Sequence, residues 1–279
     1  GKRLLGTANL LVRRAHEFRQ GMAPHLCERL VQLNPDWALF SGDFTTTSLD
    51  TEFQAARKAF APLNAALPRR VLGVPGNHDR YTWRDARRRA FERFLEKWWP
   101  EDRSPFFLPL VDGVWLIGID ATTNNGLGSY GRVLEDTAER LQLFWARHKD
   151  DVRELWILCH FPAEDPPGML RASRSNQLRD AWLLFEFLDK VRVPILYLHG
   201  HHHHRWVYGS QKHPGMTYLN AGAPWLKRLG RDPDLGFYEL HHRAGATAVF
   251  LHTRDAASGH WNQREVPLPP PGELVDLQS

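Results

Sequence analysis

The stretch Val193-Pro-Ile-Leu-Tyr-Leu-His-Gly-His-His-His-His204 joins an apolar, strand-like run to four consecutive histidines. A glycine separates the run from these histidines, and glycine lets a backbone turn sharply at the end of a strand. An expression tag would stand at a terminus beside a linker, whereas these histidines lie between two β-rich segments. The sequence therefore places them in the folded protein, at the carboxyl end of a predicted strand.

Three earlier segments repeat this arrangement of an apolar run followed by polar groups. The runs and their polar groups are Trp37–Phe40 with Ser41-Gly42-Asp43, Val71–Val74 with Gly76-Asn77-His78-Asp79, and Leu155–Leu158 with Cys159-His160-Phe161-Pro162. Carboxylate, amide and imidazole groups at the carboxyl ends of successive strands are typical metal ligands. Together these segments predict a metal site.

The motifs differ in how strongly each one indicates such a site. Gly42-Asp43 alone is a common turn, and a single histidine at a strand end, such as His160, is most often structural. Gly76-Asn-His-Asp79 is more specific, because a neutral oxygen donor, an imidazole and a carboxylate stand in consecutive positions, and the carboxylate could orient the imidazole. His201 and His203 have i, i+2 spacing, so in an extended segment both would point to the same side.

Apolar runs alternate with amphipathic helical patterns through most of the chain. Helices are expected near residues 24–34, 50–66, 83–98, 135–148 and 176–190, and strands near 37–41, 70–74, 106–110, 114–120, 154–159 and 193–198. Short β runs without helices come after the histidines, and residues 266–279 form a Pro-rich tail. This order predicts one α/β domain over residues 1–265, with β-sheets between helices.

Composition places few limits on function. The chain of 279 residues has a formal charge of +4 and a pI near 9.2, which suits an anionic substrate without requiring nucleic acid. No apolar run reaches the roughly 18–20 residues that span a bilayer. Cys27 and Cys159 are the two cysteines and give no disulfide framework, so a reducing, cytoplasmic location is expected.

Two basic stretches could contact a substrate or a surface. Residues 2–19 are basic and partly amphipathic, so they could line the mouth of the site or touch an anionic membrane, although a solvated surface is the simpler interpretation. The arginine-rich helix expected near 83–98 comes soon after Asp79. Arg80 and Tyr81 are the nearest candidates for substrate contact.

The order Gly-Asp, Gly-Asn-His-Asp, His, Gly-His-x-His, over about residues 36–222, resembles the calcineurin-like metallophosphoesterase superfamily. The resemblance implies a four-layer α/β/β/α sandwich with two mixed β-sheets. It also implies a binuclear centre of divalent manganese, iron, zinc or magnesium ions that hydrolyses phosphomonoesters or phosphodiesters.

The resemblance also implies a role for each residue that matches a motif. Asp43 would bridge the two metals, and His203 would bind the first. Asn77, His160 and His201 would complete the ligands of the second. His78 would assist the leaving group, with Asp79 orienting it, and Asn77 and His78 would also contact the substrate.

One motif of the family is absent. The family begins with an Asp-x-His pair after its first strand, and no aspartate of this chain has a histidine two residues later. Gly1-Lys-Arg-Leu-Leu5 resembles the family's sequence just after that pair, so we expect the first strand to be missing before residue 1. The first metal would then keep only Asp43 and His203, and we expect one bound ion at best and impaired turnover.

The leading interpretation is a phosphoesterase that uses a metal-activated hydroxide on a small phosphoester, such as a nucleotide. The overall pattern of motifs resembles the bacterial cyclic-nucleotide phosphodiesterase-like branch more than the protein phosphatases. One alternative is a nucleotide-lipid pyrophosphatase that is peripheral to a membrane. Another is a metallophosphoesterase-like binding scaffold without turnover, which the absent motif favours and the intact His78-Asp79 pair disfavours.

Overall fold

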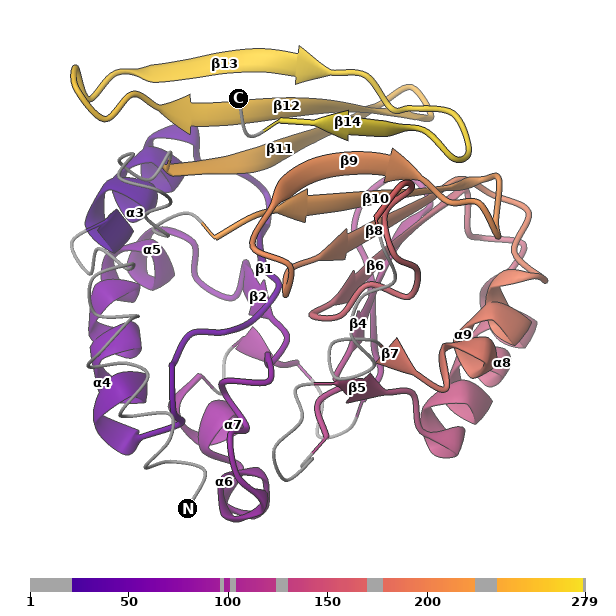
Figure 1. Cartoon of the computed structure of the whole chain (residues 1–279), viewed down its shortest axis with the longest axis horizontal. Coiled ribbons are helices and arrows are strands. Elements are labelled where there is room, and N and C mark those ends of the chain that lie inside the picture. The colour runs from indigo at the N-terminus through magenta and orange to yellow at the C-terminus, as the bar shows by residue number, and fades with distance from the viewer. Residues whose placement is uncertain are drawn as a thin grey trace.

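The computed structural model describes residues 22–95, 98–100, 104–123, 130–169, 178–223 and 235–277. Within these segments, helices lie on two outer sides of the molecule and β-strands lie between them (Figure 1). The expected sandwich of α and β layers is therefore confirmed. The basic stretch of residues 2–19 lies outside the described residues.

The larger sheet has seven strands of mixed direction, in the order β14-β9-β10-β8-β6-β4-β3. Its strands are β3 (Phe106–Pro109), β4 (Val114–Ile119), β6 (Glu154–Cys159), β8 (Ile195–His199), β9 (Arg205–Gly209), β10 (Met216–Ala221) and β14 (Leu274–Asp276). β4, β6, β8 and β10 run parallel to one another. Because parallel strands end at one edge of a sheet, the residues after β6 and β8 meet there, where Gly200 N donates to His160 O at 3.1 Å.

The second β layer consists of two separate pieces in the described part of the chain. β1 (Ala38–Phe40) pairs in parallel with β2 (Val71–Gly73). β11 (Leu235–Arg243), β12 (Ala246–Arg254) and β13 (Trp261–Val266) form an antiparallel sheet. No described strand joins the two pieces. β5 (Gly131–Arg132) and β7 (Leu178–Arg179) form a separate two-stranded parallel sheet.

The helices form the outer layers. α8 (Glu135–His148) and α9 (Ala181–Leu188) lie on one side of the large sheet, and α3 (Ala23–Leu33), α4 (Asp50–Ala59) and α5 (Ala61–Ala66) lie on the far side, next to β1 and β2 (Figure 1). α6 (Trp83–Arg88) and α7 (Ala90–Phe94) come after the second candidate motif. No helix in the described segments has the length and apolar character that a bilayer crossing requires.

Two expected helices are each divided into two. The helix expected over 50–66 breaks at Phe60, because Pro62 in the first turn of α5 has no N–H to continue the earlier helix. The helix expected over 83–98 breaks at Arg89, whose φ of 46° is left-handed.

Adjacent residues of the central strands enter two different cores. Leu116 and Leu158 pack with residues of α4, α5 and β12, whereas Ile117 and Ile157 pack with residues of α8 and α9. This alternation results from the period of two in a β-strand. Burial on both faces fixes the strands, and therefore also the loops at their carboxyl ends. The Pro-rich tail contributes β14 to the edge of the sheet.

Candidate metal centre

The loops after β1 and β2 approach each other backbone to backbone. Gly42 has a φ of +98°, and a Cβ atom there would lie under 3.0 Å from Gly76 N. A Cβ atom on Gly76 would lie under 3.0 Å from Asp43 Oδ1. Only glycine fits at both positions. The close approach brings the Asp43 carboxylate to the second loop, where His78 N donates to Asp43 Oδ1 at 3.0 Å.

Asn77 lies where two of the candidate histidines converge. Its Oδ1 atom is 3.1 Å from His160 Nε2 and 3.1 Å from His201 Nδ1. His160 Nε2 also lies 3.4 Å from Asp43 Oδ2. The structure therefore brings together Asp43, Asn77, His160 and His201, which come after four different strands.

The surroundings of the His160 and His201 imidazoles suit metal ligands. His160 Nδ1 lies 2.7 Å from Ser41 O, and since a carbonyl oxygen only accepts, Nδ1 donates to it and Nε2 is turned toward Asn77 and Asp43. Burial holds the pKa of His201 well below its usual value, so this ring is neutral. His201 Nε2 is buried and has no hydrogen-bond partner among the described residues.

Asp43 is the charged member of the group. Burial opposes its ionisation, but the imidazoles of His160 and His78 and the backbone N–H of His78 outweigh burial and lower the pKa of Asp43 to about 2. His203 acts electrostatically on both Asp43 and His201. The carboxylate is therefore ionised at neutral pH and can balance the charge of a cation.

Three candidate ligands have left-handed backbones. The φ angles are 63° for Asp43, 67° for His201 and 55° for His203. Such conformations cost non-glycine residues about 1–3 kcal/mol each and gather at functional sites. The expectation of an extended segment at His201–His203 is therefore wrong, and a turn presents these side chains. Asn220, fully buried, holds that turn by donating to Gly200 O at 3.1 Å.

Asp79 and His78 make different contacts from those expected. Asp79 Oδ2 accepts the N–H of Asp43 at 2.8 Å and of Gly76 at 2.9 Å, and Oδ1 accepts the N–H of Thr45 at 2.9 Å. His78 Nδ1 lies 2.7 Å from the carbonyl oxygen of Thr46. The ring of His78 is therefore oriented by Thr46, and Asp79 ties the two loops together. Burial and the Asp43 charge raise the pKa of Asp79 to about 7.

The two candidate substrate contacts have different surroundings. Arg80 Nη2 lies 2.6 Å from Glu92 Oε1 and 2.7 Å from Asp120 Oδ2, and its side chain is 12% exposed. Its guanidinium thus joins α7 to the end of β4. Tyr81 stacks on His78 with ring centroids 5.7 Å apart and therefore borders the site.

Sequence reasoning missed the residues that hold His78. These are Thr45, Thr46 and Ser48, and Glu52 binds the neighbouring backbone of Thr46 and Thr47. A signal was present, because a run of threonines and a serine before Asp50-Thr-Glu52 is typical of a helix start with a glutamate in the first turn.

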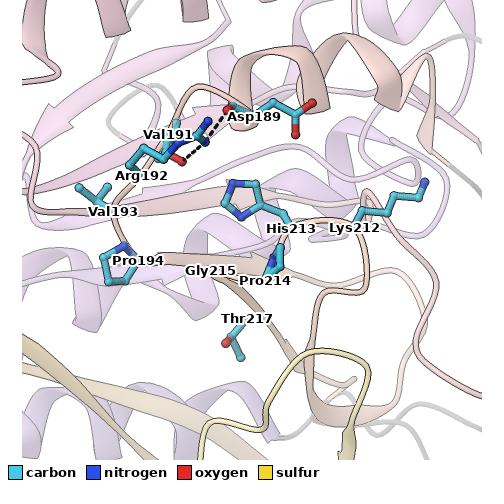
Figure 2. Close-up of a pocket in the computed structure, with 10 residues that line it drawn as sticks. All are labelled: Asp189, Val191, Arg192, Val193, Pro194, Lys212, His213, Pro214, Gly215 and Thr217. Atoms are coloured by element: carbon cyan, nitrogen blue, oxygen red, sulfur yellow. Dashed lines mark hydrogen bonds between the residues drawn. The ribbon is translucent and has the colours of Figure 1, made fainter.

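A surface groove at the start of β8 and β10 contains none of the candidate ligands. Figure 2 shows its lining, which includes Arg192, His213 and Thr217. β8 begins at Ile195, and the histidine turn comes after its other end. The groove therefore lies at the opposite edge of the sheet from the candidate site.

The residues present fit a divalent metal ion. In the described segments, no three His, Cys, Asp or Glu side chains stand in a metal-holding group, and the Asn77 amide oxygen occupies the point between the two imidazoles. The donor set is nevertheless one carboxylate, one amide oxygen and two imidazoles, which suits manganese, iron or zinc. The unpaired, buried Nε2 of His201 also indicates a site built for a further ligand.

Comparisons with known proteins agree with this fold. The sequence profile of the calcineurin-like phosphoesterases matches residues 16–205. A dimetal phosphatase from Danio rerio has a similar structure at 12% identity, with a TM-score of 0.58 over 84% of this chain and 85% of that one. PhoD is similar at 10% identity, with a TM-score of 0.53 over 88% of this chain and 69% of that one. A search of curated proteins found no match. The chain belongs to the calcineurin-like phosphoesterases, a family of phosphoester hydrolases.

Proposed function

We propose that this chain hydrolyses a small phosphomonoester or phosphodiester, using a divalent metal ion held by Asp43, Asn77, His160 and His201. One observation carries the proposal: Asn77 Oδ1 lies 3.1 Å from ring nitrogens of both His160 and His201, with the ionised Asp43 beside them. For a second ion, the described residues offer Asp43 and His203.

The contacts assign a separate task to each group. A bound divalent cation supplies charge neutralisation at the phosphate and a nucleophilic water at neutral pH. Asp43 would provide the balancing negative charge, and the imidazoles of His160 and His201 would each provide a ring nitrogen. Ser41 O keeps the His160 ring in the orientation that turns Nε2 toward Asp43 and Asn77.

His78 is the proposed proton donor to the leaving group. Its Nδ1 atom lies 2.7 Å from Thr46 O, which orients the ring. In the imidazolium form both nitrogens carry protons, so Nε2 can donate while Nδ1 stays bonded to Thr46 O. The stacked Tyr81 ring limits the movement of His78.

The test is hydrolysis of p-nitrophenyl phosphate and bis-p-nitrophenyl phosphate with manganese, iron, zinc or magnesium. We expect one ester to be hydrolysed, EDTA to stop the reaction, and His201→Ala to lower kcat/KM about 100-fold or more. His260→Ala, which changes an exposed histidine in the connection between β12 and β13, is the control. Metal binding without hydrolysis of either ester would instead show a binding scaffold and contradict the proposal.

A further inference from the structure

The segment Asp43–Ser48 holds His78 at several atoms. Asp43 Oδ1 accepts the N–H of His78 at 3.0 Å, and Thr46 O lies 2.7 Å from its Nδ1. The hydroxyls of Thr45 and Ser48 lie 2.9 Å and 2.7 Å from its carbonyl oxygen. We call these four residues, Asp43, Thr45, Thr46 and Ser48, the His78 clamp. The clamp fixes both the backbone and the ring of His78.

Ser48 closes the clamp from one side. Its hydroxyl donates to His78 O at 2.7 Å and accepts the N–H of Tyr81 at 2.8 Å. One hydroxyl thus spans the turn from His78 to Tyr81, whose ring stacks on that of His78. Ser48 is fully buried and has a left-handed φ of 59°. Since a left-handed serine is strained, surrounding contacts must hold it in place.

Glu52 supplies the contacts that fix this segment. Its Oε2 atom accepts the N–H of Thr47 at 3.0 Å, the N–H of Leu49 at 2.9 Å and the hydroxyl of Thr47 at 3.1 Å. Its Oε1 atom lies 3.3 Å from Thr46 N. Glu52 stands in the first turn of α4, where a negative charge also interacts favourably with the helix dipole. The carboxylate therefore anchors the clamp to a regular element.

We propose that Ser48 and Glu52 are positioning residues for proton donation by His78. Glu52 fixes residues 46–49, and the Ser48 hydroxyl binds the turn 78–81 to that segment. The proposal rests on the proposed function, because it assigns His78 to the leaving group. A proton donor must lie within hydrogen-bond reach of the leaving oxygen, and a displacement of about 1 Å can cost 100-fold in rate. Loss of either side chain therefore weakens donation without removing a metal ligand.

The leaving group provides the test. A poor leaving group such as phenolate needs protonation, whereas p-nitrophenolate leaves readily without it. For Ser48→Ala and Glu52→Gln we expect kcat on the phenyl ester to fall about tenfold or more, and kcat on the p-nitrophenyl ester to fall less than about threefold. KM and metal content should stay unchanged. In a His78→Ala background, Ser48→Ala should cause no additional loss.

Asp50→Asn is the matched control for Glu52→Gln. It removes a negative charge from the same helical turn, but Asp50 pairs with Arg88 and Arg93 rather than with the clamp. We expect it to leave the ratio of the two rates unchanged. An equal fall of kcat on both esters in Ser48→Ala and Glu52→Gln would show a merely structural role and overturn the proposal.

A second measurement separates this proposal from the proposed function. Long-range ¹H–¹⁵N NMR spectra of the metal-free chain report the tautomer of His78 and the protection of its Nδ1–H, without any turnover. We expect a protected Nδ1–H in the wild type and Asp50→Asn, and loss of protection in Ser48→Ala and Glu52→Gln. Unchanged protection in those two variants would overturn the positioning role. If the wild type hydrolysed neither ester, the proposed function would be wrong. These spectra would still show whether Ser48 and Glu52 hold the ring of His78 in place.

Discussion

At the scale of single residues, the pKa values of Asp43 and Asp79 are shifted in opposite directions, although a hydrogen bond joins the two residues. Asp43 N donates to Asp79 Oδ2 at 2.8 Å. Imidazoles and a backbone N–H lower the pKa of Asp43 to about 2, despite its burial. Burial and the Asp43 charge raise the pKa of Asp79 to about 7, against the backbone N–H groups that it accepts. Asp43 is thus kept charged, and Asp79 ties the two loops together.

This difference predicts a pH dependence of stability in the metal-free protein. The pKa of an aspartate in an unfolded chain is about 3.9, so between about pH 4 and 7 the folded chain binds an extra proton at Asp79. The stability from that proton is fully present below about pH 4 and is lost as pH rises through about 7. We expect the free energy of unfolding of the wild type to fall in this way as pH rises. That of Asp79→Asn should not show this fall.

Urea unfolding in EDTA across this pH range measures the effect. Asp79→Asn should also be less stable throughout by about 1–3 kcal/mol, because its NH₂ group cannot accept the backbone N–H groups. Wild-type and Asp79→Asn profiles that ran parallel from about pH 5 to 8 would contradict the assignment.

At the scale of elements, the site depends on two loops that touch through glycine. The sequence patterns located the strand ends, because apolar runs and polar motifs are local signals. They could not show the approach of Gly42 to Gly76, which is a contact between separate loops. The left-handed turn at His201 and His203 was missed for a related reason, since i, i+2 spacing predicts a shared side only where the backbone is extended.

The close approach predicts that Gly76→Ala weakens metal binding. The new Cβ would press against the Asp43 carboxylate and backbone, so one loop must shift. We expect metal affinity to fall about tenfold or more, measured by calorimetric titration with Mn²⁺. Gly215→Ala is the control, because a Cβ there lies 3.6 Å or more from its neighbours. Equal affinity of Gly76→Ala and the wild type would show that this contact does not set the site.

At the scale of the whole molecule, the large sheet brings the distant motifs together. β6 and β8 are parallel neighbours, so His160 and the histidine turn meet at one edge although about 40 residues separate them. The alternation of apolar runs and helical patterns was sufficient to predict the layers. It could not predict that β1–β2 and β11–β13 form separate pieces, because strand order depends on contacts between distant segments. The contact between His78 and Thr46 could not be predicted either, because it depends on how two loops pack.

We propose above that Asp43, Asn77, His160 and His201 together hold a divalent ion. Metal content after loading with Mn²⁺ and exhaustive dialysis tests it most directly, in the wild type and in Asn77→Ala, His160→Ala and His201→Ala. We predict that the wild type retains manganese, that each of the three variants loses it, with affinity lowered about 100-fold or more, and that His260→Ala retains it. Retention of manganese by all three variants at the wild-type level would show that these residues do not hold the ion.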